Sequence, residues 1–165
     1  MERVEGLGII PETGVERMTS YIIYETDEFD PLTYFFNQCG LEMKPGSPMP
    51  EGLVKMWRME DQQTNELLGA AILEIRDSVY TLADLGVRED QRNKGYGREL
   101  QRTVFDEARN LGVKELWGTA KVPAYYYPLG WEKVEWDIAP KIATKCDGCK
   151  QRGTECQPFI LKYKL

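Results

Sequence analysis

The chain has 165 residues, of which 42% are hydrophobic and 29% are charged, a composition typical of one soluble globular domain with its own core. Its formal net charge of −6 argues against nucleic acid as a partner, because phosphate binding needs a basic face. No apolar run approaches the roughly 18 residues of a membrane span. We therefore expect no membrane partner, and the absence of a signal-peptide pattern predicts a cytoplasmic protein.

The first predicted elements are a strand and a helix. Residues 1–20 show no clear pattern and are expected to form an N-terminal arm. Tyr21–Glu25 is rich in residues that favour strands and predicts the first strand. A helix should follow, with Asp30 at its N-cap and Pro31 at its first position, and Gly40 should end it.

A meander of strands is predicted next. The Pro- and Gly-rich segment 45–52 is incompatible with a helix or a central strand and predicts a long loop. Runs of strand-forming residues separated by short polar turns then predict three antiparallel strands, over Leu53–Glu60, Leu67–Arg76 and Val79–Val87.

The second half of the chain adds one crossover. An apolar stripe predicts a helix from Arg98 to Leu111, and Gly112 is its stop signal. A strand over Val113–Thr119 should pair in parallel with Val79–Val87, because a helix separates the two. A short helix and two strands complete the chain, over Pro123–Tyr127, Trp131–Asp137 and Phe159–Leu165. The predicted fold is a single α+β domain with a mixed, mostly antiparallel central sheet, flanking helices and one parallel β-α-β crossover.

The junction between strand Val79–Val87 and the following helix has the features of an anion site. Gly95 and Gly97 let the backbone approach a ligand, and the first turn of a helix offers unpaired N–H groups and the positive end of its dipole. The spacing is neither GxxxxGK[ST] nor GxGxxG, which excludes the common nucleotide loops. It reads Arg-x-x-Gly-x-Gly, beginning at Arg92.

This pattern resembles the acyl-CoA pyrophosphate loop of the GNAT acetyltransferase superfamily, Gln/Arg-x-x-Gly-x-Gly/Ala. Two further stretches, in the family's order, strengthen the resemblance. Asp84-Leu85-Gly86-Val87 looks like the end of the family's fourth strand, and Ala124–Trp131 looks like its Phe-Tyr-x-x-Leu-Gly-Phe stretch. The resemblance covers residues 21–165 and implies the GNAT fold, in which the sheet splays at the crossover.

The resemblance implies transfer of an acetyl group from acetyl-CoA to a primary amine, on a small molecule or a peptide, by direct attack in a ternary complex. Pantetheine would lie along the strand end, where a bulge at Gly86 would expose backbone N–H groups. The residues implied in acetyl-CoA binding are Leu85, Gly86, Val87, Arg92, Asn93, Lys94, Gly95, Tyr96, Gly97 and Arg98.

Catalytic groups are implied in the same way. Tyr126 takes the place of the family tyrosine that gives a proton to the departing thiolate, with Tyr127 its neighbour if the register slips by one. The other interpretation is that these tyrosines only pack a short helix. Asp84 is the first candidate for the base, directly or through water, and Glu74 the second. Either carboxylate could instead be held by a neighbouring basic group.

Three cysteines lie in an insertion, residues 138–158, that the family's last hairpin lacks. Cys146, Cys149 and Cys156 could bind zinc, with Asp147, a water or another subunit as fourth ligand. Unligated cysteines, or one disulfide and one thiol, are the alternatives. In the family this loop borders the acceptor site.

Two functions from other classes remain open at this point. A non-catalytic acyl-CoA sensor would keep the loop without the acid and base, and a metal- or redox-responsive protein would use the cysteine cluster. The oligomeric state is expected to be a monomer or a homodimer.

Overall fold

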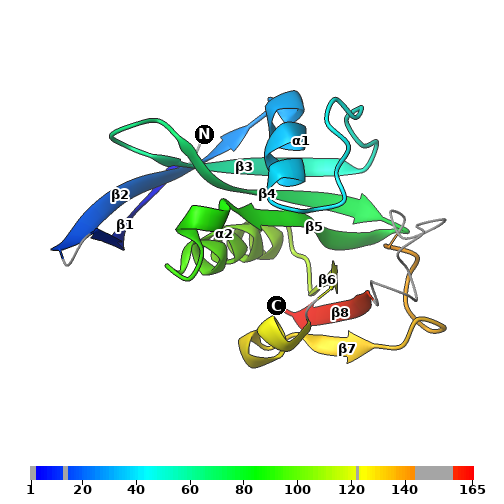
Figure 1. Cartoon of the computed structure of the whole chain (residues 1–165). Coiled ribbons are helices and arrows are strands. Elements are labelled where there is room, and N and C mark those ends of the chain that lie inside the picture. The colour runs from blue at the N-terminus through cyan, green and yellow to red at the C-terminus, as the bar shows by residue number, and fades with distance from the viewer. Residues whose placement is uncertain (1–2, 13–14, 122, 144–157) are drawn as a thin grey trace.

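The computed structural model describes residues 3–12, 15–121, 123–143 and 158–165. Helices α1 (Phe29–Gln38) and α2 (Tyr96–Asn110) cover opposite faces of one sheet (Figure 1). The strands within the described residues are β1 (Arg3–Glu12), β2 (Val15–Thr26), β3 (Leu53–Asp61), β4 (Leu67–Arg76), β5 (Val79–Val87), β6 (Glu115–Ala120), β7 (Glu132–Val134) and β8 (Phe159–Lys164).

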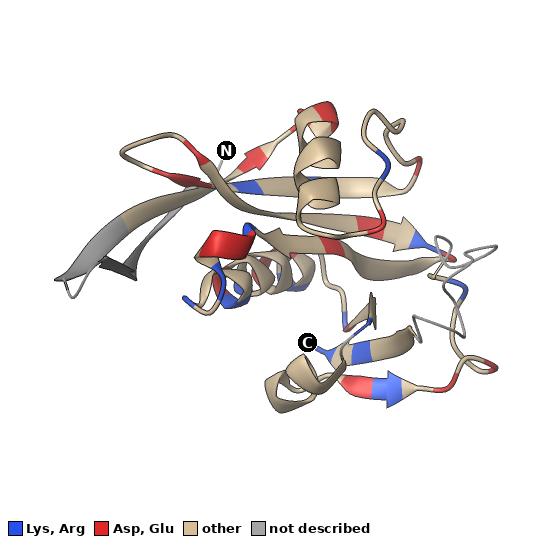
Figure 2. Ribbon diagram, in the orientation of Figure 1, with Lys and Arg blue, Asp and Glu red and all other residues tan. Residues whose placement is uncertain are grey.

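These eight strands lie in the order β1-β2-β3-β4-β5-β6-β8-β7 within the described chain. Neighbouring strands are antiparallel except β5 and β6, which are joined through α2 and run in parallel. The predicted α+β class with one parallel crossover is therefore confirmed. No helix in the described ranges is both long and apolar enough to cross a bilayer. Figure 2 shows basic and acidic residues interspersed along most elements.

The N-terminal segment, for which the sequence predicted no regular element, pairs as a hairpin at one edge of the sheet. The register of β1 and β2 runs from Arg3 opposite Tyr24 to Glu12 opposite Val15. Pro11 is accommodated because β1 is an edge strand, in which a missing N–H leaves no ladder bond unmade.

Helix α1 begins earlier than the sequence predicted. Its first residue is Phe29 and its N-cap is Glu28, so the prediction of Asp30 as N-cap is wrong by two residues. Phe29 is buried, and the earlier start of the helix places its ring in the core between α1 and the sheet. Asp30 then lies in the first turn, where a carboxylate favours the dipole. Gly40, at φ +85°, ends the helix as predicted.

Gly86 is explained by the close approach of α1 to β5. A Cβ at this position would lie 3.2 Å from Cδ1 of Phe36 and 3.3 Å from Sγ of Cys39. The sheet irregularity lies elsewhere. Asp84 pairs with Ile72 while Leu82 pairs with Leu73, so the extra residue of the bulge is Ala83. The predicted bulge at Gly86 is therefore wrong, and the glycine serves helix packing instead.

Replacing Gly86 with alanine should destabilise the fold by roughly 1–3 kcal/mol, because the added methyl overpacks the interface with α1. Adding Cys39→Ala should recover part of that loss by removing Sγ. Urea unfolding of the four proteins of this double-mutant cycle measures the coupling. If the changes in unfolding free energy caused by Gly86→Ala and Cys39→Ala simply added in the double variant, the proposed contact would be contradicted.

The sheet opens between β5 and β6. In the described chain these strands share one bridge, Thr81 with Trp117, and diverge beyond it. Helix α2 and an aromatic cluster hold the two halves together, with ring centroids of Phe105 and Tyr163 4.4 Å apart and those of Trp131 and Tyr163 5.5 Å apart. The splay that the resemblance implied is present.

Three further boundaries differ from the predictions. Helix α2 begins at Tyr96 rather than Arg98, because Gly95 at φ +84° serves as its N-cap. Strand β7 is three residues long, since Trp131 turns into the core and donates Nε1 to Gln101 Oε1 at 3.3 Å. The predicted short helix is two 3₁₀ turns, η2 (Pro123–Tyr125) and η3 (Tyr127–Leu129).

Candidate functional site

The loop between β5 and α2 forms a concave row of free backbone donors. It contains the 3₁₀ turn η1 (Glu89–Gln91), and both Asn93 and Gly95 adopt positive φ angles, of 65° and 84°. Among the described residues, the N–H groups of positions 93–98 donate no hydrogen bond, and the first such bond of the helix is Glu99 N–H to Gly95 O at 3.2 Å. Free N–H groups in such a nest at a helix N-terminus bind anions.

The basic side chains of this loop have different partners. Arg92 donates Nε to Val87 O at 3.2 Å and Nη2 to Cys39 O at 3.0 Å, so it ties the loop to β5 and α1 instead of projecting toward an anion. Lys94 donates to Oε1 of Gln91 at 3.1 Å. Arg98 is exposed and makes no ion pair within the described chain. Arg92 therefore supports the loop, and Arg98 leaves a positive charge exposed at the start of α2.

Substituting these two arginines should separate the two roles. Arg92→Gln should raise the Kd for CoA about tenfold, or ~1.4 kcal/mol, at every salt concentration, because the loop loses its tether. Arg98→Gln should raise the Kd at low salt and approach wild type at high salt, because an exposed charge is screened. Calorimetry at two ionic strengths measures both. The same salt dependence in the two variants would argue against the assignment.

The strand end leading into the loop presents backbone groups to the open side of the sheet. Arg88 N–H donates to Leu68 O of the β4 side at 2.9 Å. Backbone groups alternate along a strand, so those of Gly86 also face β4, whereas the N–H and C=O groups of Leu85 and Val87 point toward the gap beside β6, where Val87 O already accepts from Arg92 Nε. A linear ligand with amide groups could add to this edge as a strand does.

The tyrosine turn lies next to the anion loop. Tyr125 places its hydroxyl 3.4 Å from the position of a Cβ on Gly97, which brings η2 against the start of α2. Tyr126 is half-buried, and its ring packs 5.0 Å from Tyr125 and 6.0 Å from Trp131 between centroids. Its hydroxyl makes no hydrogen bond within the described chain, yet it is not sealed from solvent. Burial raises the pKa of the Tyr126 phenol above its ordinary value.

Both candidate carboxylates lie on the face of the sheet covered by α1. Asp84 pairs with Ile72, a residue of the core beneath α1, and Glu74 follows Ile72 by two positions on the same strand face. Asp84 is 7% exposed and Glu74 3%. Oε2 of Glu74 accepts from Nε of Arg76 at 2.8 Å, so this carboxylate is held by a basic neighbour.

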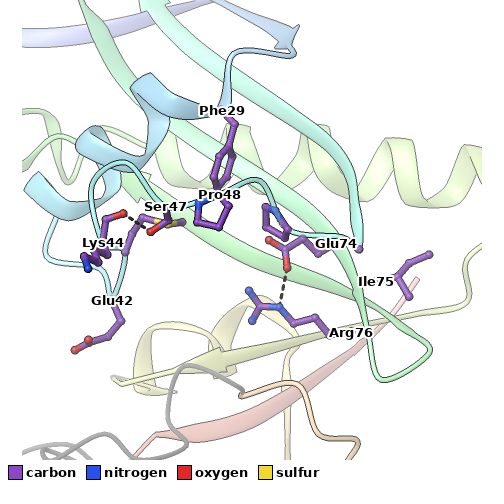
Figure 3. A pocket seen from close by; sticks show the side chains of 11 residues that line it. Phe29, Glu42, Lys44, Ser47, Pro48, Glu74, Ile75 and Arg76 are labelled. Atoms are coloured by element: carbon purple, nitrogen blue, oxygen red, sulfur yellow. Dashed lines mark hydrogen bonds and ion pairs between the residues drawn. The ribbon is translucent and has the colours of Figure 1, made fainter.

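A pocket of about 450 Å³ opens beside Glu74 on this face (Figure 3). It combines the loop after α1 with the end of β4, and Figure 3 shows Glu74 joined to Arg76 at one side. The sequence indicated the long loop and Glu74 separately but not the pocket, because its lining comes from the start of α1, the loop after it and the end of β4. Its residues are Phe29, Glu42, Met43, Lys44, Ser47, Pro48, Pro50, Gly52, Glu74, Ile75 and Arg76.

The proposed zinc ligands Cys146, Cys149 and Cys156 lie outside the described residues. Within the ranges that the structure does describe, no group of three or more Cys, Asp or Glu side chains is placed to hold a metal ion. Cys39 is half-buried there, and burial raises the pKa of its thiol.

A sheet that splays at its parallel crossover, with a free strand edge running into an anion-binding helix start, defines the acyl-CoA-dependent acyltransferases. The sequence supports the same conclusion. Residues 18–126 match the acetyltransferase (GNAT) family, and because this match spans well over half of the chain, the protein belongs to that family.

Solved structures share the fold at low sequence identity. N-acetylglutamate synthase from Neisseria gonorrhoeae, complexed with coenzyme A and L-arginine, is 19% identical at a TM-score of 0.64, covering 88% of this chain and 33% of its own. A GNAT acetyltransferase from Staphylococcus aureus is 12% identical at 0.62, covering 88% and 99%. The ribosomal-protein-S18-alanine N-acetyltransferase of Escherichia coli is 18% identical at 0.60, covering 87% and 93%. The chain thus spans about a third of the synthase.

Proposed function

We propose that the protein transfers the acetyl group of acetyl-CoA to a primary amine by direct attack in a ternary complex. The observation that supports this most strongly is the free edge of β5 running into the unpaired N–H groups of positions 93–98. Pyrophosphate would bind these N–H groups, and pantetheine would add to Leu85 and Val87.

The chemistry needs three groups at the point where β5 and β6 part. The amine nitrogen attacks the thioester carbon, and a backbone N–H that faces the gap, at Leu85 or Val87, stabilises the negative oxygen. As the C–N bond forms and the C–S bond breaks, the amine loses a proton to a base and the thiolate gains one from an acid. Tyr126 is our acid.

We keep Asp84 as the proposed base, directly or through water. It is nearly buried on a central strand, next to the bulge at Ala83. Glu74 is the second candidate, and Oε2 of its carboxylate accepts a hydrogen bond from Nε of Arg76.

The structural relatives include an N-acetylglutamate synthase and an N-acetyltransferase of an alanine of ribosomal protein S18, and their low sequence identity shows a shared fold without identifying the acceptor. A cytoplasmic location, a monomer or homodimer, and a role for zinc at the three cysteines stay predictions. Elemental analysis of the reduced, purified protein would test the zinc.

Turnover with acetyl-CoA tests the proposal. Release of free CoA thiol, and the mass of the product, should be followed with a panel of amino acids, peptides, polyamines and aminoglycosides. We expect thiol release that depends on one class of amine and an acceptor that gains one acetyl group. Tight CoA binding with no transfer to any amine would favour the sensor function instead.

A further inference from the structure

We propose that the acceptor is a free α-amino acid with an apolar side chain, bound as a zwitterion in the pocket beside Glu74 and Arg76 (Figure 3). This inference rests on the proposed function, because it names the amine that the transfer would use. It goes beyond that function by assigning each charge of the acceptor to a side chain.

The two charged groups at one side of the pocket each keep bonding positions that no described residue uses. Glu74 uses Oε2 for Arg76, and within the described chain Oε1 has no partner. Arg76 uses Nε for Glu74 and Nη1 for Ile142 O at 3.1 Å, which leaves Nη2. Among the described residues, the sealed side-chain atoms without a partner are only Arg58 Nε and Tyr96 Oη, so Oε1 of Glu74 and Nη2 of Arg76 are not sealed from solvent, and both residues line the pocket.

A carboxylate and a guanidinium that are bound together, each with unused bonding positions, match a ligand that carries both charges close together. Oε1 of Glu74 would accept from the ammonium, and Nη2 of Arg76 would donate to the carboxylate. Glu74 is 3% exposed, so an ammonium that bonds to it loses much of its water, and its attraction to the carboxylate has to offset that desolvation cost. A polycation would be repelled by the guanidinium of Arg76, and a simple carboxylate by the carboxylate of Glu74.

The rest of the pocket supplies an apolar wall. Phe29 and Met43 are buried beneath it, and Pro48 and Pro50 form its outer part. A pocket of about 450 Å³ lies within the usual range for small-molecule sites. An aliphatic side chain the size of leucine would remove this apolar surface from water.

The pocket lies at the right place along the sheet for transfer. Glu74 pairs with Thr81, the residue whose bridge to Trp117 is the last contact before β5 and β6 part. An ammonium at Glu74 is therefore beside the opening through which the thioester would be presented. Asp84 lies on the same face further along β5 and would take its proton.

Binding of a matched ligand series to the CoA-saturated wild-type protein tests this directly, by calorimetry. L-Leucine should bind at least about tenfold more tightly than leucinamide, which lacks the carboxylate, and 4-methylpentanoate, which lacks the amine. Spermidine and the dipeptide Ala-Leu complete the series. The same amines are then compared as acetyl acceptors.

Two variants test which side chain binds the carboxylate of the ligand and which binds its ammonium. Arg76→Gln should remove the preference for leucine over leucinamide, and Glu74→Gln should remove the preference for leucine over 4-methylpentanoate. Lys133→Gln, which removes a cation from an exposed ion pair on β7, is the matched control and should change neither preference. If a variant does not fold, the ligand series measured on the wild-type protein still tests whether a free amino acid is preferred.

Equal or tighter binding of leucinamide, spermidine or Ala-Leu would overturn the inference. Transfer to several amines without a preference for the amino acid would overturn it too, while leaving the proposed function standing. Leucine binding without transfer to any amine would instead remove the proposed function, and with it leucine's role as acceptor.

Discussion

Replacing Tyr126 with phenylalanine should lower kcat by about 10²–10³-fold, the usual contribution of a positioned proton donor, and leave the Kd for CoA unchanged. The ring still packs against Trp131, so stability should change little. The hydroxyl, however, has no partner in the described chain and is free to give its proton to the thiolate. Single-turnover kinetics and CoA calorimetry check the two halves of this prediction.

Tyr127→Phe is the matched control, because this neighbouring ring is 42% exposed and the same atom is removed. It should leave kcat at the wild-type value. If Tyr127→Phe lost activity and Tyr126→Phe did not, the proton donor would be Tyr127, as a slip of one residue in the family motif would require.

The pH dependence follows from the raised pKa of Tyr126. A donor must hold its proton, and burial keeps this phenol protonated above its ordinary pKa of about 10. Wild-type kcat should therefore stay level through pH 10 and fall only above it, and the residual rate of Tyr126→Phe should lack that fall. A decline of the wild-type rate well below pH 10 that Tyr126→Phe abolishes would contradict this role.

Replacing Gly97 with valine should raise the Kd for CoA about 100-fold, or ~3 kcal/mol, with little change in Tm. The folded protein has room at this position, since a Cβ would lie 3.4 Å from Tyr125 Oη and 3.7 Å from Val87 Cγ2, both ordinary contacts. The extra methyl groups would instead occupy the space that a phosphate needs beside the free N–H groups.

Gly97→Ala provides the graded control, because the family pattern accepts alanine at this place in the loop. It should bind CoA close to wild type. Equal affinities for all three proteins would mean that the pyrophosphate does not approach the start of α2, and the anion site would have to be sought elsewhere.

The features that were predicted correctly from the sequence depend on local signals. The loop from Arg92 to Gly97, the crossover through α2 and the stop at Gly40 each follow from residues that are neighbours in the chain. Such features depend on backbone conformation, which glycine spacing and apolar periodicity report directly. The family motif rests on the same kind of feature, which is why it could be identified before the fold was known.

Apart from the helix boundaries, the errors concern contacts between distant segments. Arg92 bonds to Cys39 O, 53 residues away, so its supporting role could not be predicted from the loop alone. The position of the bulge depends on how β4 and β5 align. The pocket joins the loop after α1 to the end of β4, and only the folded chain shows that Glu74 and Arg76 share one wall of it.

Within the described residues β5 and β6 share a single bridge, between Thr81 and Trp117, so pantetheine bound as we propose would complete the sheet. Amide hydrogens of Leu85 and Val87 should exchange rapidly with solvent, whereas that of Gly86, directed at β4, should exchange slowly. Pantetheine bound along this edge would slow the first two. Because the ligand would then connect both half-sheets, the thermal stability of the protein should rise with CoA concentration, so the supply of its own co-substrate would set how long the folded chain persists.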